Sequence, residues 1–247
     1  MKTTKEILKN IETNRNIIKE FEEKADAIRK EKNSIRNAYQ AAPDKGLFRK
    51  TNDPRMDQLT IEAGEITDAI KEITVINKIL MHNYRIALFE EIAPAIVETL
   101  TKYNGKAYGP KTREKIRNEI SVKTGCHFYI QERSYCSEIH ISNDVLFYSN
   151  ALDIETWTDD DAGNRKRWEL LPGNKINAPA LENLKIYNSE YIDDPAGRAR
   201  ELKAAYENIL EKKDELEKSC NAYNEIICFS MEPAYGSKNF YSGCYGE

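Results

Sequence analysis

The chain has 247 residues, which is enough for one large domain or two modest ones with a sizeable core. Its 37 Lys and Arg residues nearly balance its 41 Asp and Glu residues, and the formal net charge is -4. This balance excludes a strongly basic nucleic-acid coat and a polyanionic tail, but it leaves room for a local basic patch.

Targeting and cysteine usage indicate a cytoplasmic protein. The first residues run directly into a charged amphipathic segment with no apolar core of a secretory signal. The most apolar stretch, residues 86–100, is interrupted by three glutamates and Pro94, so it cannot span a bilayer. Five cysteines without a CxxC pair fit a disulfide framework poorly, and we expect reduced thiols. They are Cys126, Cys136, Cys220, Cys228 and Cys244.

The first forty residues carry a coiled-coil pattern. Positions spaced alternately four and three apart are apolar in eight of ten cases, and a repeat of this kind keeps one stripe on a partner helix. The stripe consists of Ile7, Ile11, Asn14, Ile18, Phe21, Ala25, Ile28, Lys32, Ile35 and Tyr39. Thr3 and Glu6 form a capping box at its start, and the polar positions Asn14 and Lys32 are expected to fix register.

A second long helix begins at the Asp53-Pro54 signal, after a break at residues 40–53. The same spacing continues through Leu59, Glu62, Ile66, Ala69, Ile73, Ile76, Leu80, Asn83 and Ala87. Pro94 is expected to kink or restart the helix and to leave a separate short helix over residues 94–103. Two long stripes joined by a short loop predict an antiparallel helical hairpin.

A third stripe follows Asp194-Pro195 near the other end of the chain. It consists of Leu202, Tyr206, Ile209, Lys213, Leu216, Cys220, Tyr223 and Ile227. This helix either returns to the hairpin and completes a three-helix stalk, or the hairpin recruits its missing surface from a second copy of the chain.

Aromatic and β-branched residues between these helices predict a small sheet. A helix from Pro110 to about Lys123 precedes five expected strands at residues 126–132, 138–142, 145–149, 153–158 and 167–171, which form a mainly antiparallel meander. A further strand is conceivable at residues 184–187, and residues 160–164 have the composition of a tight turn.

The predicted fold class is therefore α+β, a long antiparallel coiled-coil stalk with an inserted sheet domain. The expected organisation is a helical hairpin over 1–103, the α+β insert over 104–195, a helix over 196–229 that returns to the stalk, and an irregular tail over 230–247.

The sequence offers no catalytic constellation, so we expect no enzyme, no cofactor and no metal. None of the three histidines, His82, His127 and His140, sits in a known nucleophile or metal motif, and strand alternation makes His140 an ordinary surface histidine. Cys126, His127, Cys136 and His140 match no zinc spacing.

Positive charge gathers around the helix of the insert and in the later hairpin. These candidate nucleic-acid contacts are Lys111, Arg113, Lys115, Arg117, Arg165, Lys166 and Arg167. Neighbouring acids such as Glu114 and Glu119 dilute the field, and phosphate binding depends on uncompensated cations. Nucleic-acid binding is therefore the alternative function.

Residues 102–116, followed by Thr124-Gly125 and the aromatic strand Phe128-Tyr129-Ile130, resemble a segment of uncharacterised coiled-coil proteins of phages and prophages of Gram-positive bacteria. The resemblance covers about a third of the chain and supplies no catalytic residues. It implies an accessory phage protein acting in the cytoplasm of a bacterial host, where inhibition of a defence nuclease such as a CRISPR effector is one common task.

The first hypothesis is a non-enzymatic protein that binds another macromolecule, a nuclease or nucleoprotein complex among the candidates. Its expected contact is an apolar-basic tip between the two long helices, made of residue types that anchor interfaces: Leu47, Phe48, Arg49 and Lys50. Simple closure of the hairpin explains the same residues equally well. Self-association as a homodimer through the stalk is also expected, and no membrane partner is.

Overall fold

The computed structural model describes residues 1–41, 53–132, 137–146, 152–159 and 165–230, without the side chains of 157–159, 165–166 and 224–230. These residues form four α-helices and an antiparallel sheet, which confirms the mixed helix-and-sheet class. The chain divides into two compact units, residues 1–193 and residues 194–247.

Local capping signals start the two long helices where the sequence places them. Helix α1 (Thr4–Gln40) has the expected capping box, because Glu6 N–H donates to the Thr3 hydroxyl and Thr3 N–H donates to the Glu6 carboxylate. Helix α2 (Pro54–Lys102) is capped by Asp53, whose carboxylate accepts a hydrogen bond from Arg55 N–H at 2.9 Å.

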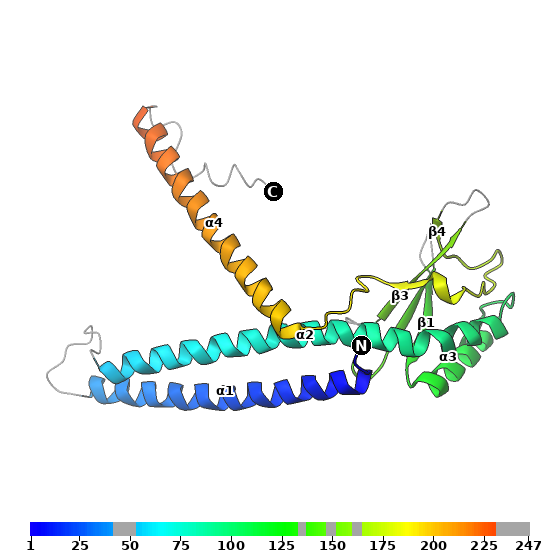
Figure 1. The fold of residues 1–247 in the computed structure, drawn as a ribbon, viewed down its shortest axis with the longest axis horizontal. Coiled ribbons are helices and arrows are strands. Elements are labelled where there is room, and N and C mark those ends of the chain that lie inside the picture. Colours follow the sequence, from blue (N-terminus) through cyan, green and yellow to red (C-terminus); the bar gives the residue numbers. More distant parts are fainter. Residues whose placement is uncertain (42–52, 133–136, 147–151, 160–164, 231–247) are drawn as a thin grey trace. The chain divides into compact units, whose positions relative to one another are not determined.

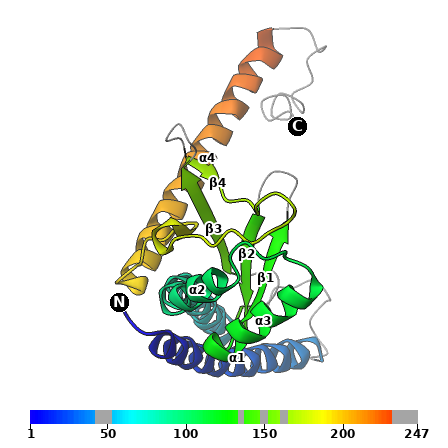
Figure 2. The same cartoon turned by 90° about the vertical axis from the view of Figure 1, so that its right-hand side faces the viewer.

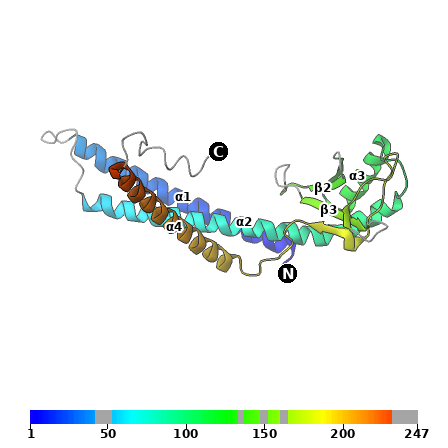
Figure 3. The same cartoon turned by 90° about the horizontal axis from the view of Figure 1, so that it is seen from above.

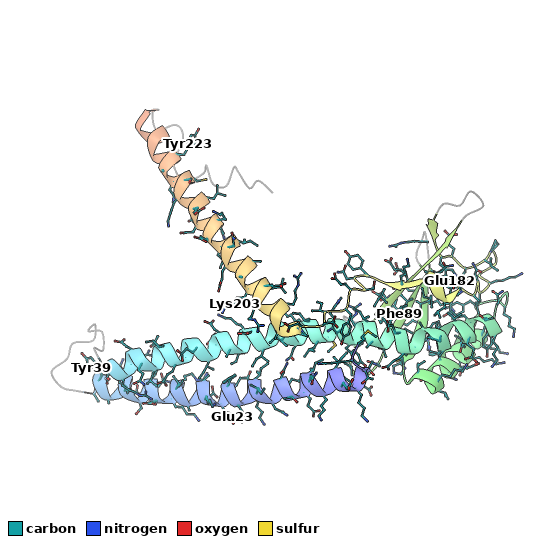
Figure 4. The ribbon with its side chains drawn as sticks, in the orientation of Figure 1. Glu23, Tyr39, Phe89, Glu182, Lys203 and Tyr223 are labelled. Carbon is teal, nitrogen blue, oxygen red and sulfur yellow. The ribbon has the colours of Figure 1, made fainter. Side chains whose placement is uncertain are left out.

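Helices α1 and α2 lie side by side and antiparallel (Figure 1, Figure 3). Three contacts fix this direction: Thr4 Oγ1 donates to Glu91, Asn14 Nδ2 donates to Asn77 Oδ1 at 2.9 Å, and Arg55 forms an ion pair with Glu31 at 2.8 Å. Further evidence of the pairing is that Glu23 projects from the side of α1 that faces away from α2 (Figure 4). The stripe of α1 is buried only at Ile7 and Ile11, near the sheet, and is half-buried beyond them.

The Asn14–Asn77 hydrogen bond is expected to fix how α1 and α2 align, at a cost in the free energy of unfolding. Replacing both asparagines by leucine should raise the free energy of unfolding by about 1 kcal/mol, because apolar contact replaces a half-buried polar pair. Urea titration measures this gain. The matched single variant Asn14→Leu leaves Asn77 without its partner and should be less stable than the double variant. Equal stability of the two variants would show that an unpaired Asn77 costs nothing, which would contradict a structural role for this hydrogen bond.

The separate short helix expected after Pro94 is wrong, because α2 continues through Pro94 to Lys102. A proline inside a helix costs about 3 kcal/mol through its missing N–H and its ring clash. Ile92, Ala93, Ile96 and Leu100 surround it and are all at least 96% buried. Burial of these side chains on both sides of the proline outweighs the local penalty.

The insert begins with helix α3 (Pro110–Thr124), which ends at Gly125 in the left-handed conformation with φ 69°. Strands β1 (His127–Glu132), β2 (Ser137–Ser142), β3 (Leu152–Asp159) and β4 (Arg165–Arg167) follow in meander order. Strand β5 (Leu184–Ile186), at the position of the conceivable last strand, pairs antiparallel with β3.

Two of the expected strands differ from the observed ones. Residues 145 and 146 form a bend, and the rest of the strand expected over 145–149 lies outside the described residues, as does the expected turn at 160–164. The strand expected over 167–171 is wrong: β4 already ends at Arg167, and Trp168 instead joins two strands. Its N–H donates to the Thr156 carbonyl at 2.9 Å, and its own carbonyl accepts from Ser137 N–H at 3.0 Å.

One face of the sheet packs on the helices and makes the core. Phe128, Ile139, Ile141, Leu152 and Ile154 point to this inner face and are each at most 1% exposed. They form one cluster with the C-terminal half of α2, with α3 and with the first turns of α1. Figure 2 shows α3 and α2 lying against the sheet. The core therefore spans the base of the hairpin and the sheet.

The second unit is described through residue 230 and contains helix α4 (Pro195–Ser230). Asp194 caps it, since the Asp194 carboxylate accepts a hydrogen bond from Gly197 N–H at 2.9 Å. The predicted N-cap signal is thus confirmed.

Candidate functional site

The predicted tip lies outside the described residues, because Leu47, Phe48, Arg49 and Lys50 all fall in the gap at 42–52. The side chains of Arg165 and Lys166 are also outside the described set. The tip, like the tail beyond residue 230, stays a prediction.

The predicted basic helix α3 uses part of its charge within the protein. The Arg113 guanidinium lies 4.7 Å from the centre of the Tyr108 ring and pairs with Glu132 at 3.0 Å. Arg117 Nε donates to the Phe128 carbonyl at 3.4 Å. Lys111 and Lys115 are exposed and have no acidic partner within the described part of the chain. Two of the four predicted cations thus hold α3 to its neighbours.

Tyr108 anchors the start of α3 to the first strand. Its hydroxyl accepts a hydrogen bond from Ile130 N–H at 3.0 Å, and burial raises the pKa of the Tyr108 phenol. Because Arg113 also donates to the Tyr108 carbonyl at 3.0 Å, the cations of α3 keep a fixed position relative to β1.

The face of the sheet opposite the core carries an ordered set of polar and aromatic side chains, which we call the outer face. Strand alternation places them there, since they occupy the positions between the core residues on β1, β2, β3 and the end of β4. The outer face consists of Tyr129, Glu138, His140, Asp153, Glu155 and Arg167.

His140 lies at the centre of the outer face, and its interpretation as an ordinary surface histidine is wrong because it is only 9% exposed. The register of the sheet sets Tyr129 on one side of it and Asp153 on the other. The His140 ring stacks on Tyr129 with centroids 4.9 Å apart and planes 6° from parallel. His140 Nδ1 lies 2.6 Å from Asp153 Oδ1.

Arg167 joins β2 and β3 across the same face. Its guanidinium contacts Glu138 Oε1 at 3.4 Å and Glu155 Oε1 at 3.3 Å. Glu138 is 9% exposed, so an uncompensated carboxylate at this position would be costly. The Arg167 guanidinium therefore offsets acidic charge within the sheet, as Arg113 offsets that of Glu132.

An Asp–His pair can orient an imidazole for proton transfer, but a nucleophile must then reach the other ring nitrogen. Within the described residues, both ring nitrogens of His140 are buried, and neither has a partner with hydrogen-bond geometry. No group of three His, Cys, Asp or Glu side chains in the described ranges is placed to hold a metal ion. Burial therefore closes Nε2 to a reacting group in this arrangement.

The described helices lack the combination of length and apolar character that crossing a bilayer requires. Comparison of the chain with protein-family models, with curated proteins and with solved structures gives no match.

Proposed function

We propose that this protein is a non-enzymatic macromolecular-interaction protein. In this proposal α1 and α2 wind around each other as a coiled-coil stalk, and the outer face of the sheet binds a partner protein. The antiparallel contacts along α1 and α2, together with the alternating four-three spacing of their apolar residues, support the stalk.

The outer face is the observation that carries the proposal. Tyr and Arg are residue types that contribute strongly to protein interfaces, and here Tyr129 stacks on His140 while Arg167 pairs with Glu138. Side chains that are fixed before binding lose little conformational entropy when a partner arrives.

Charge on this face favours a protein over a nucleic acid. Asp153, Glu138 and Glu155 supply three carboxylates against two cations, Arg167 and the exposed Lys185, which lies opposite Glu155 in the sheet. Phosphates bind through cations that are not already neutralised, and carboxylates repel them. The phage resemblance adds a host defence nuclease as the proposed partner, a choice that rests on the sequence alone.

Replacing His140 by phenylalanine tests the outer face. The variant keeps an aromatic ring against Tyr129 but removes Nδ1, which lies beside the exposed Asp153 carboxylate. We therefore expect the fold to survive, Asp153 to lose its fixed position, and partner capture from a bacterial lysate to fall about tenfold. Quantitative mass spectrometry of proteins retained by the immobilised chain measures this. The control Lys115→Ala alters an exposed residue of α3 and should capture the partner normally. Undiminished capture by His140→Phe would refute the proposed surface.

Lys111 and Lys115 favour nucleic-acid binding as a second candidate, since both are exposed. In this case Lys115→Ala should weaken binding, because Lys111 and Lys115 would contact phosphates. Gel shifts at several salt concentrations should show a steep salt dependence that becomes shallower in a Lys111→Ala/Lys115→Ala variant. Weak binding with no salt dependence would leave the protein-binding proposal as the better one.

A further inference from the structure

Helix α4 carries an exposed apolar stripe, which we define as Leu202, Tyr206, Ile209, Leu210 and Leu216. Each of these side chains is between 44% and 63% exposed. Figure 4 shows side chains projecting from α4 between the labelled residues Lys203 and Tyr223. Large apolar side chains gathered on one helix face mark an interaction surface.

We propose that this stripe binds the same stripe of a second copy of the chain, as an antiparallel two-helix coiled coil. The alternating spacing assigns Leu202, Ile209 and Leu216 to the d positions of a heptad, with Tyr206, Lys213 and Cys220 at the a positions. A self-complementary contact of this kind is closed by a two-fold axis and needs no other partner.

The a and d residues are complementary when the second helix runs in the opposite direction. Each a position then meets a d position of the other copy, so Tyr206 lies opposite Leu216, Lys213 opposite Ile209, and Cys220 opposite Leu202. The Lys213 stem packs on an apolar side chain, and its ammonium group can reach water. In a parallel pair the two Lys213 side chains would face each other in the seam.

The flanking residues point to the same direction. In the antiparallel register Lys203 approaches Glu217 of the second copy on both sides of the axis, and the two Leu210 side chains meet near it. The two Lys212 side chains also approach, but Lys212 is paired with Glu215 of its own helix at 2.9 Å. A parallel pair would instead bring Arg198 close to Lys203 of the second copy.

Disulfide trapping tests the direction of the pair. In a background with Cys136, Cys228 and Cys244 replaced by serine, two cysteines remain, and Cys126 is buried with a thiol pKa raised by burial. Adding Leu202→Cys should give a covalent dimer on mild oxidation through Cys220 of the other copy, and Cys220→Ser should abolish it. The background alone should stay monomeric on a non-reducing gel.

The other arrangements give different results in the same experiment. A parallel pair would cross-link the background through the two Cys220 side chains, without the Leu202→Cys change. Packing of α4 on its own chain, or on a different protein, would give no covalent dimer and the mass of a single chain by light scattering. Either result overturns the proposal.

Charge exchange supplies a second test that does not depend on oxidation. Lys203→Glu should weaken dimerisation about tenfold, since two attractive pairs become repulsive, and Lys203→Glu/Glu217→Lys should restore it. In a parallel pair Lys203→Glu would instead strengthen association, because it would meet Arg198. Lys218→Glu makes the same charge change away from the stripe. It also breaks the pair of Lys218 with Asp214 of its own helix at 2.7 Å, so circular dichroism is used to check that α4 stays helical, and the dissociation constant should then be unchanged in sedimentation measurements.

The self-association test and the partner test are independent. His140→Phe alters the outer face of the sheet and should leave the sedimentation behaviour unchanged, whereas Lys203→Glu should leave partner capture by a monomeric chain intact. A failure of one proposal is therefore distinguishable from a failure of the other.

Discussion

Replacing Trp168 by alanine is expected to lower the free energy of unfolding of the first unit by about 3–5 kcal/mol. Trp168 is fully buried, and its indole N–H donates to the Asn177 carbonyl at 2.9 Å. Its backbone also joins Thr156 on β3 to Ser137 on β2. Loss of the ring therefore opens a cavity at the point where two strands and the following loop converge.

The measurement is urea unfolding, followed by circular dichroism and by hydrogen exchange of the β2 amides. Trp168→Phe is the matched comparison, because it keeps most of the ring volume and removes only the donor to Asn177. This variant should lose about 1–3 kcal/mol, the cost of an unsatisfied buried carbonyl plus a small void. A smaller loss of unfolding free energy in Trp168→Ala than in Trp168→Phe would show that the Trp168 ring does not fill the core.

The helices could be predicted from the sequence because their signals are local. The capping residues Thr3, Asp53 and Asp194 lie within a few positions of the groups they cap, and the apolar spacing repeats along each helix. The unbroken course of α2 through Pro94 could not be predicted in the same way. It depends on the burial of Ile96 and Leu100 against residues far away in the chain.

The candidate site depended on strand register, which the sequence left open. Alternation correctly placed His140 on the face opposite Ile139 and Ile141. It could not show that Tyr129 and Asp153 flank the ring, because they come from two other strands. The signal in the sequence that marked this site was His140, a polar residue between the apolar residues Ile139 and Ile141 of one strand.

Charge compensation was hidden for the same reason. Arg113 pairs with Glu132 on β1, and Arg167 pairs with Glu138 on β2, so both partners are distant in the sequence. A count of nearby cations therefore overstated the positive field around α3. Of the predicted nucleic-acid contacts on α3, Lys111 and Lys115 are exposed and their charges are not offset by these ion pairs.

The second large effect is expected at Asn83, a polar residue in the apolar stripe of α2. Asn83 is 1% exposed, and its amide pairs with both backbone groups of Ile192: Nδ2 donates to the carbonyl at 2.7 Å and Oδ1 accepts from the N–H at 3.0 Å. Asn83→Ala should lower the free energy of unfolding of the first unit by about 2–3 kcal/mol, since two hydrogen bonds are lost and a small cavity forms.

This pair of hydrogen bonds determines where the chain leaves the first unit, so the effect should also be local. Limited proteolysis should cleave Asn83→Ala faster than the wild type between Tyr187 and Asp193. His82→Ala is the matched control on the adjacent residue, because His82 Nε2 contacts the Glu190 carbonyl at 2.9 Å, a single backbone group where Asn83 pairs with two. Its loss should stay below about 1 kcal/mol, since the Glu190 carbonyl is exposed and water can replace the imidazole. Equal cleavage of wild type and Asn83→Ala would mean that Tyr191, whose hydroxyl accepts from Lys2 N–H at 3.2 Å, holds the segment instead.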